Sequence, residues 1–170
     1  MSGLTGLYSI RPAAGPADCD AARALFLEYA AWLQEDLCFQ GFDAELATLP
    51  GRYAPPDGRL FLACRDAVPV GCVALRRFDA ESGEVKRLYV QPADRGHGVA
   101  RALSAAVVEA AREIGYRRLV LDTLNRMTAA RRLYAATGFR EICAYYETPI
   151  CGTRFMELLL REGGRGKGEG

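Results

Sequence analysis

The sequence predicts an α/β protein in which one mixed sheet of about seven strands has helices packed against it. Segments with strand and helix periodicity alternate along the chain, and three strands joined by short turns lie near its middle. A continuous apolar strand then follows a long amphipathic helix, as expected for a strand buried on both faces. The 170 residues, half hydrophobic and a quarter charged, have the size and composition of one domain. We expect this domain over residues 1–162 and a flexible glycine-rich tail over residues 163–170.

The first third of the chain predicts one strand, two helices and a loop. Alternating residues indicate a strand over 7–11, and prolines then separate it from a long helix over about 18–37. Apolar residues recur at helical spacing in this helix, which predicts that the single tryptophan, Trp32, packs in the core. A short helix follows over 42–49. Two adjacent prolines in residues 52–59 exclude regular structure there and predict a surface loop, which could form a substrate wall.

Three strands are predicted next, over residues 60–64, 70–78 and 84–90, and the short connections between them indicate antiparallel pairing. In the third strand, strict alternation of side chains would divide the residues between two faces. Under that rule one face carries Glu84, Lys86, Leu88 and Val90, and the other carries Val85, Arg87 and Tyr89.

The last part predicts two helices and three strands. An apolar stripe indicates a helix over about 98–114 that ends at Gly115. The apolar run at 119–123 predicts a buried strand parallel to its neighbour, and a second helix covers about 127–137. A final pair of strands is expected in FREICAYY and GTRFMELLL.

Composition excludes several classes of protein. A net charge of +1 argues against general nucleic-acid binding, and no apolar run approaches the ~18 residues of a membrane helix. The first residues do not resemble a secretory signal, so we expect a cytoplasmic protein that contacts neither membrane nor nucleic acid. The six cysteines form no CxxC pair, and the chain has a single histidine as a further possible ligand, so no metal site is expected. They are interpreted as reduced, mostly buried thiols.

Positive charge is concentrated in the middle and second half of the chain, where residues 86–140 include eleven basic and four acidic residues. This excess fits either a phosphorylated ligand or an arginine-rich, solvated helix face. Within it lies RGHGVA (residues 95–100), between a strand and a helix. Glycines and a helix N-terminus suit a phosphate, although an ordinary strand-to-helix connection has the same pattern. The spacing is that of neither a Walker P-loop nor a dinucleotide-binding turn.

Two motifs together resemble those of the GNAT superfamily of acyl-CoA-dependent N-acyltransferases. The family pattern Q/R-x-x-G-x-G/A is matched by Arg95, Gly98 and Ala100, after a strand that ends in LYV. A second pattern, an LY pair followed by GF, is matched by Leu133, Tyr134, Gly138 and Phe139. The order of elements from residue 7 to residue 160 agrees with that fold, so the resemblance covers nearly the whole chain.

The resemblance implies acetyl-CoA as acyl donor, with no metal. The pantetheine arm would pair with the strand at Leu88, Tyr89 and Val90. Asn125 is expected to bond the pantetheine, or equally to cap the helix that follows. His97 is interpreted as a cofactor-side loop residue rather than a catalytic one. The backbone N–H groups expected to hold the pyrophosphate belong to Arg95, Gly96, His97, Gly98, Val99, Ala100 and Arg101.

The resemblance also implies roles in catalysis. Tyr134 matches the general acid that protonates the departing thiolate, with packing at the helix end as the alternative. Glu84 is the candidate base, with a surface glutamate beside Lys86 as the alternative. The expected reaction is N-acetyl transfer to a primary amine by direct attack in a ternary complex. Two rivals are a non-catalytic acyl-CoA-binding sensor and a protein that binds another nucleotide.

The amine acceptor is not identified by the sequence. Acidic residues along the first two helices fit a cationic amine, or simply a solvated helix face. Tyr53, Tyr145 and Tyr146 are expected either to line the acceptor site or to pack. The apolar run FMELLL could lie at a sheet edge and form a homodimer.

Overall fold

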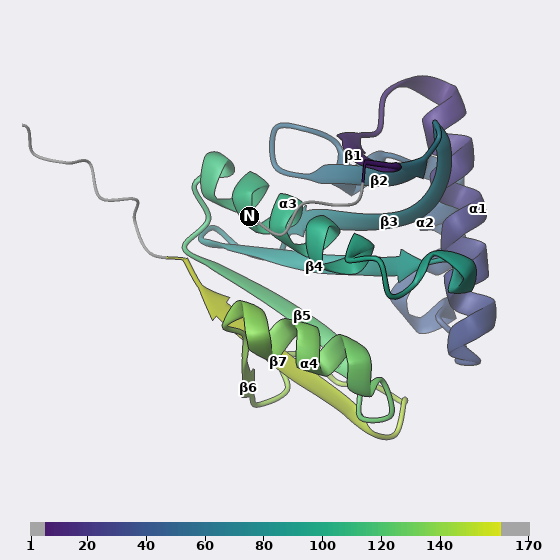
Figure 1. Ribbon diagram of the computed structural model, residues 1–170. Coiled ribbons are helices and arrows are strands. Elements are labelled where there is room, and N and C mark those ends of the chain that lie inside the picture. The colour runs from purple at the N-terminus through teal and green to yellow at the C-terminus, as the bar shows by residue number, and fades with distance from the viewer. Residues whose placement is uncertain (1–5, 161–170) are drawn as a thin grey trace, which may run out of the picture.

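The computed structural model describes residues 6–160, which form one seven-stranded mixed sheet with helices on both faces (Figure 1). The order of strands in the sheet is β1-β2-β3-β4-β5-β7-β6. This confirms the predicted fold class. The proposed tail, residues 163–170, lies outside the described residues. The strands are β1 (Tyr8–Pro12), β2 (Arg59–Arg65), β3 (Val68–Arg77), β4 (Ser82–Val90), β5 (Arg118–Leu124), β6 (Arg140–Ile142) and β7 (Thr153–Leu159).

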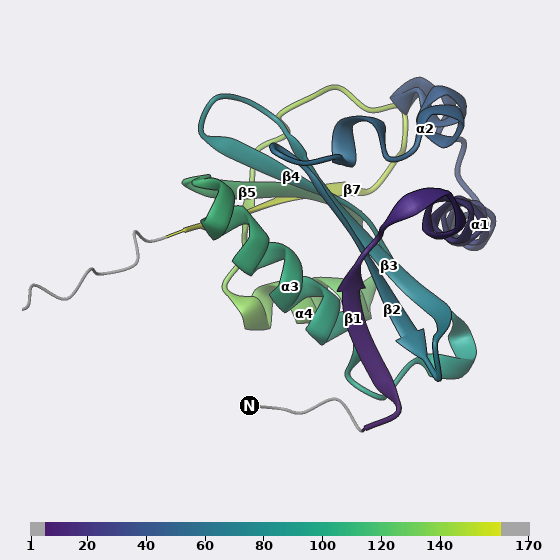
Figure 2. The ribbon, with the colours of Figure 1, turned by 90° about the horizontal axis from the view of Figure 1, so that it is seen from above.

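Four α-helices cover the two faces of the sheet. α3 and α4 lie on one face, and α1 and α2 lie on the other (Figure 2). α3 ends as predicted, because Gly115 adopts a left-handed conformation that closes the last turn. Gly138 ends α4 in the same way. The bounds are α1 (Gly15–Leu33), α2 (Phe42–Thr48), α3 (Val99–Ile114) and α4 (Thr128–Thr137).

α1 starts earlier and ends earlier than predicted. Pro16 lies in its first turn, where the missing N–H would have had no partner in any case. The helix stops where Gln34 turns left-handed, with φ of 57°. The predicted loop at residues 52–59 is largely confirmed, because only a short 3-10 turn, Gly51–Tyr53, touches it before β2 begins.

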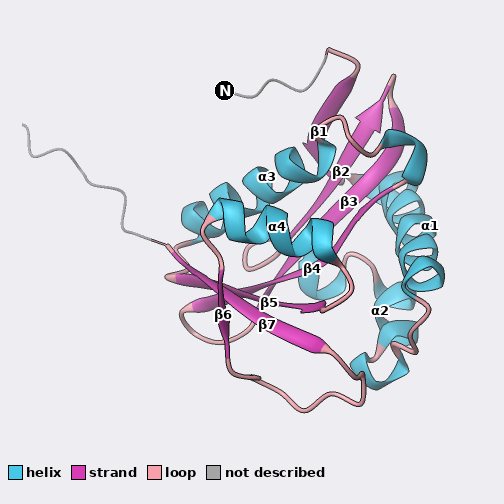
Figure 3. Cartoon of the chain, turned by 60° about the horizontal axis from the view of Figure 1, so that its bottom comes forward, coloured by secondary structure: helices cyan, strands magenta, loops and turns pink. Residues whose placement is uncertain are grey.

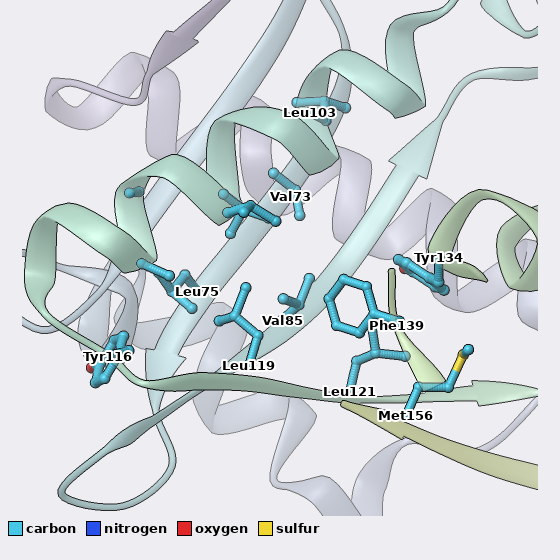
Figure 4. Close-up of a cluster of buried hydrophobic side chains, with 14 of the residues drawn as sticks. Val73, Leu75, Val85, Leu103, Tyr116, Leu119, Leu121, Tyr134, Phe139 and Met156 are labelled. Atoms are coloured by element: carbon cyan, nitrogen blue, oxygen red, sulfur yellow. The ribbon is translucent and has the colours of Figure 1, made fainter. Parts of the chain in front are cut away.

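Two apolar clusters hold the helices to the sheet. The cluster under α3 and α4 includes Leu103, Val73 and Leu121 (Figure 4). The cluster under α1 includes Phe26 and Leu62, both with no exposed surface. Burial of each such side chain contributes about 1.5–3 kcal/mol, so both faces of the sheet are firmly covered.

A β-bulge interrupts β4 at Arg87, which has φ of +61°. Cys72 of β3 is opposite Tyr89, but Ala74 is opposite Lys86, so β4 carries one extra residue between them. Lys86 and Arg87 consequently point to the same side, and both donate hydrogen bonds to Gln40. The predicted alternation was therefore wrong beyond Lys86. Leu88 and Val90 pack toward α3, opposite Glu84 and Lys86.

β4 and β5 separate along their length. They pair in parallel only where Ser82–Glu84 lie beside Arg118–Val120, whereas β5 pairs with β7 over its whole length. Figure 3 shows the two strands diverging toward the end that carries α1 and α2. Residues 85–90 of β4 therefore have no strand beside them on the β5 side. This opening positions the site described below.

Two other expectations are corrected. Trp32 is 41% exposed rather than in the core. In the run FMELLL, Phe155–Glu157 pair with β6, whereas residues 158–160 have no strand of the described chain beside them on that side, so the expected homodimer stays a prediction. All six cysteines are free thiols, but Cys38, Cys143 and Cys151 are exposed rather than buried. Within residues 6–160, no helix is long and apolar enough to span a bilayer.

Candidate active site

Three adjoining cavities lie along β4, and one of them lies in the opening between β4 and β5. The groove cavity, about 320 Å³, lies between β4 and the N-terminus of α3. The junction cavity, about 40 Å³, lies between the diverging strands and shares Leu88, Met127 and Ala130 with the groove. The outer cavity, about 350 Å³, shares Gln40 and Lys86 with the junction. A ligand in the groove and another in the outer cavity would therefore meet at the junction.

The groove cavity contains an anion cradle. Gly96 and Gly98 have φ of +83° and +80°, and a Cβ atom at either position would have no heavy atom within 4 Å. None of the backbone N–H groups from Gly96 to Arg101 donates to any group in residues 6–160. Six unpaired donors, three of them in the first turn of α3, add to the positive end of the helix dipole. The site therefore suits a phosphate or pyrophosphate.

Side chains on β1, β2 and α1 support this loop. Asp94 is buried, and one of its oxygens accepts hydrogen bonds from Tyr8 and Arg65. The guanidinium of Arg95 lies 4.8 Å from the ring centre of Trp32, and its Nε donates to the Val90 carbonyl. Trp32 thus forms a wall of the groove. Its helical spacing could not distinguish this role from core packing.

Most of the predicted cofactor residues meet in the groove, and two do not. His97 stacks on Tyr8, with 5.7 Å between ring centres, and does not line the cavity. Asn125 is exposed, and its side-chain oxygen accepts from Arg154. It does not cap α4 either, because that helix begins after Met127 without a side-chain cap. The predicted residues that line the groove are Leu88, Tyr89, Val90, Arg95, Gly96, Gly98, Val99, Ala100 and Arg101.

The unpaired edge of β4 connects the cradle with the junction. Because β5 diverges after Val120, the edge of β4 from Val85 to Val90 on that side is free to bond an extended chain. The groove side of this edge is mostly apolar, and Leu88 and Ala130 line both the groove and the junction. A ligand with a phosphate end and an amide-containing arm would fit this shape.

Tyr134 lines the junction cavity from α4. Its ring is buried and packs edge-on against Phe139, with 5.5 Å between ring centres. Its hydroxyl makes no hydrogen bond to any group in the described part of the chain. Burial raises the pKa of Tyr134 well above its usual 10, with Tyr29 and Asp122 adding to the shift. The phenol therefore keeps its proton at neutral pH, and its hydroxyl can donate that proton into the small junction cavity.

Asp122 faces the same cavity and was missed by the sequence analysis. Its two oxygens accept from Lys86 at 3.2 Å and from the Tyr146 hydroxyl at 2.7 Å. Burial would raise the pKa of Asp122, but Lys86, Tyr146 and Arg87 together hold it below the usual 3.8. The sequence did contain a signal for Asp122, because it is the one charged residue in the apolar run LVLDT. A carboxylate buried in such a strand needs a polar or charged partner.

Glu84 lines the outer cavity and is 3% exposed. One of its oxygens accepts from Arg76 at 2.7 Å, and the other accepts from the Tyr145 hydroxyl at 2.8 Å. The alternative of a surface glutamate beside Lys86 is therefore wrong, because Glu84 is buried and Lys86 pairs with Asp122. Glu84 and Tyr134 face adjoining cavities that share the Lys86 side chain as a boundary.

The acidic residues of the first two helices do not line the outer cavity. Glu28 accepts from Gln91, and Glu35 pairs with Arg126. Glu45 pairs with the buried Arg87 and accepts from the Tyr53 hydroxyl, so Tyr53 packs rather than lining the outer cavity. Tyr145 and Tyr146 do line that cavity.

The sequence and the fold of this chain are similar to those of known proteins. The chain matches the family model "Acetyltransferase (GNAT) family" over residues 23–139. An uncharacterised N-acetyltransferase of Schizosaccharomyces pombe is 38% identical over 146 residues, which cover 84% of this chain and 89% of the relative. An acetyltransferase structure from Streptococcus agalactiae has a TM-score of 0.75 at 22% identity, and covers 92% of this chain and 100% of its own. A GNAT acetyltransferase from Elizabethkingia anophelis with acetyl-CoA bound has a TM-score of 0.64 at 24% identity, with 92% and 100% covered.

Proposed function

Because this chain belongs to the GNAT acetyltransferase family, we propose that it transfers the acetyl group of acetyl-CoA to a primary amine within a ternary complex. The observation that carries the proposal is the adjacency of the three cavities. An anion cradle, an unpaired strand edge and a buried phenol follow one another, and the outer cavity adjoins the junction across Gln40 and Lys86. A donor and an acceptor bound at the two ends would react between β4 and β5.

The groove residues fit acetyl-CoA by charge and shape. The six free N–H groups of Gly96–Arg101 would bind the pyrophosphate, and the free edge of β4 would bond the pantetheine arm. When bound, acetyl-CoA supplies an acetyl group activated as a thioester. A backbone N–H on the free edge of β4 would donate to the thioester carbonyl oxygen and stabilise the negative charge that develops on it.

Tyr134 would act as the general acid. The amine nitrogen attacks the carbonyl carbon, the carbon–sulfur bond breaks, and the phenol gives its proton to the leaving sulfur. Because burial raises the pKa of Tyr134, the phenol stays protonated throughout the neutral range. The hydroxyl is free to turn toward the sulfur, since no described group holds it in another bond.

Glu84 would accept the proton that the amine loses, directly or through the Tyr145 hydroxyl, to which it is hydrogen-bonded at 2.8 Å. Asp122 is a weaker candidate for this step, because the lowered pKa makes it a poorer proton acceptor. Its bonds to Lys86 and Tyr146 give it a positioning role at the boundary between the cavities.

The test measures release of the free CoA thiol from acetyl-CoA in the presence of a panel of primary amines. Tyr134→Phe should lower kcat about 10²- to 10⁴-fold and leave acetyl-CoA affinity within about twofold, because only the transition state needs the proton. Glu84→Gln should lower kcat/KM by a similar factor at pH 7 and by less at pH 9, where more of the amine is already neutral.

Glu113→Gln is the matched control, because Glu113 is an exposed glutamate on α3 that lines none of the three cavities and has no ion-pair partner among residues 6–160. It should retain wild-type turnover. Full turnover in Tyr134→Phe would remove the acid role, and a Glu84→Gln loss that does not change with pH would remove the base role. Tight acetyl-CoA binding without thiol release for any amine would instead support a non-catalytic sensor.

A further inference from the structure

We propose that the acceptor amine carries a carboxylate, and that Arg52 and Arg76 bind that carboxylate in the outer cavity. This inference rests on the proposed function, because it names the class of amine that the same site acetylates. It replaces the expectation of a cationic acceptor, since the acidic residues of the first two predicted helices do not line this cavity.

The argument starts from the charges of the outer cavity. Five charged side chains line it, and three of them are cationic. Glu84 pairs with Arg76, and Lys86 pairs with Asp122 of the junction. Glu147 is exposed at the rim. Arg52 and Glu147 are the two charged lining residues without an ion-pair partner among residues 6–160, so Arg52 is the cation of this wall that no carboxylate occupies.

Arg52 is held in place without being neutralised. One guanidinium nitrogen donates to the Arg77 carbonyl at 3.0 Å, and its other N–H groups bond no described residue. The short turn Gly51–Tyr53 that carries it is anchored by Tyr53, which is 2% exposed. Arg52 is exposed, so these free N–H groups are accessible to an anion that enters the cavity.

Arg76 provides the second half of the anion site. Its Nε donates to Glu84. Its two terminal nitrogens bond no described group, and both remain accessible rather than buried. Arg52 and Arg76 line the outer cavity together, and they also share the neighbouring cavity near α2. Two guanidinium groups that present free N–H donors to one cavity suit a planar carboxylate, which can accept paired hydrogen bonds.

The opposite side of the cavity leads to the chemistry. Gln40 and Lys86 border both the outer cavity and the junction, so the amine of a bound acceptor would enter there, near Glu84. The remaining walls include the rings of Phe39, Phe78 and Tyr145. Glu84 lies 2.7 Å from Arg76, so an amine near Glu84 and a carboxylate on Arg76 would be close together, as they are on the α-carbon of an amino acid. An α-amino acid with an apolar side chain directed toward these rings matches this lining.

The test compares matched amines that differ only by a carboxylate: alanine with ethylamine, leucine with isopentylamine, and phenylalanine with phenethylamine. The acid of at least one pair should show a kcat/KM at least tenfold above that of its amine. Arg52→Gln should remove about 10- to 100-fold of kcat/KM for the acid, and should leave the decarboxylated amine and acetyl-CoA affinity unchanged. Arg132→Gln is the control, because Arg132 is exposed on α4 and lines none of the three cavities.

Calorimetry with N-acetylphenylalanine and N-acetylphenethylamine separates this inference from the proposed function, because it needs neither turnover nor acetyl-CoA. Tighter binding of the acid that disappears in Arg52→Gln would support the carboxylate site, even if acetyl-CoA failed to bind and the proposed function fell. A preference for decarboxylated or cationic amines, or an acid preference that survives in Arg52→Gln, would overturn the inference. Turnover of such amines would at the same time leave the proposed function intact.

Discussion

Tyr134 shows how burial equips one residue for a proton transfer. A phenol in water has a pKa near 10, close to the pKa of about 10.4 at which half of an alkyl amine is neutral. In this protein the ring lies under α4 against Phe139, and the hydroxyl opens on the junction cavity. Burial disfavours the phenolate and so raises the pKa of Tyr134. The acid therefore stays protonated at the pH values where the nucleophile is most abundant.

A pH profile tests this property. The raised pKa of Tyr134 moves loss of its proton to higher pH, so the acid form persists above pH 10. The rate should consequently rise as the amine loses its proton and should show no descending limb between pH 8 and 11. Measurement of kcat/KM for the amine over that range checks this, with Tyr134→Phe as the reference. A fall with a midpoint at or below pH 10 that is absent from the variant would contradict the raised pKa.

Residue-scale prediction from the sequence had a clear limit. The motif residues Gly98 and Tyr134 could be found because glycine before a helix and a tyrosine before GF are local patterns. Asp122 and Trp32 could not be assigned, because their roles depend on side chains from β4, α1 and the loop at Arg95. Tertiary partners, rather than local spacing, decide whether such a residue packs or lines a cavity.

Among the elements, the bulge in β4 and the N-terminus of α3 matter most. The bulge turns Lys86 and Arg87 to one side and places both beside Gln40. Arg87 is then buried and forms an ion pair with Glu45, and this ion pair joins α2 to β4. No alternation rule reveals an extra residue in a strand, so the sequence assigned Leu88 and Val90 to the wrong face.

Gly98 permits a sharp test of the anion cradle. It is left-handed at the N-terminus of α3, and a Cβ there would point into open space that belongs to the groove. Gly98→Leu should therefore block acetyl-CoA binding while costing only the left-handed strain of about 1–2 kcal/mol. Loss of at least tenfold in affinity, measured by calorimetry, is the expected result.

Gly115→Leu is the matched control at the other end of the same helix. Gly115 is also left-handed and also has open space at its Cβ position, but it does not line the groove. Both variants should unfold at similar temperatures, whereas only Gly98→Leu should lose the ligand. Equal acetyl-CoA affinity in the two variants would show that the groove is not the binding site.

The whole molecule shows why the general fold could be predicted and the site only in part. Periodicity located all seven strands and four helices to within a few residues, because each element buries one apolar face. The order β5-β7-β6 and the separation of β4 from β5 arise from pairings between distant segments. The outer cavity depends on that separation, so its lining of Arg52, Arg76 and Glu84 was not visible in the sequence.

The most direct test of the central claim is the thermal midpoint of the wild-type protein with acetyl-CoA, CoA, ATP or NAD in parallel. A ligand at a hundred times its Kd adds about 2.7 kcal/mol of stability, which corresponds to about 5 to 10 °C for a chain of this size. We expect shifts of that order with acetyl-CoA and CoA and none comparable with ATP or NAD. No shift with acetyl-CoA, or a larger one with ATP or NAD, would contradict the assignment of the groove and the acetyl transfer derived from it.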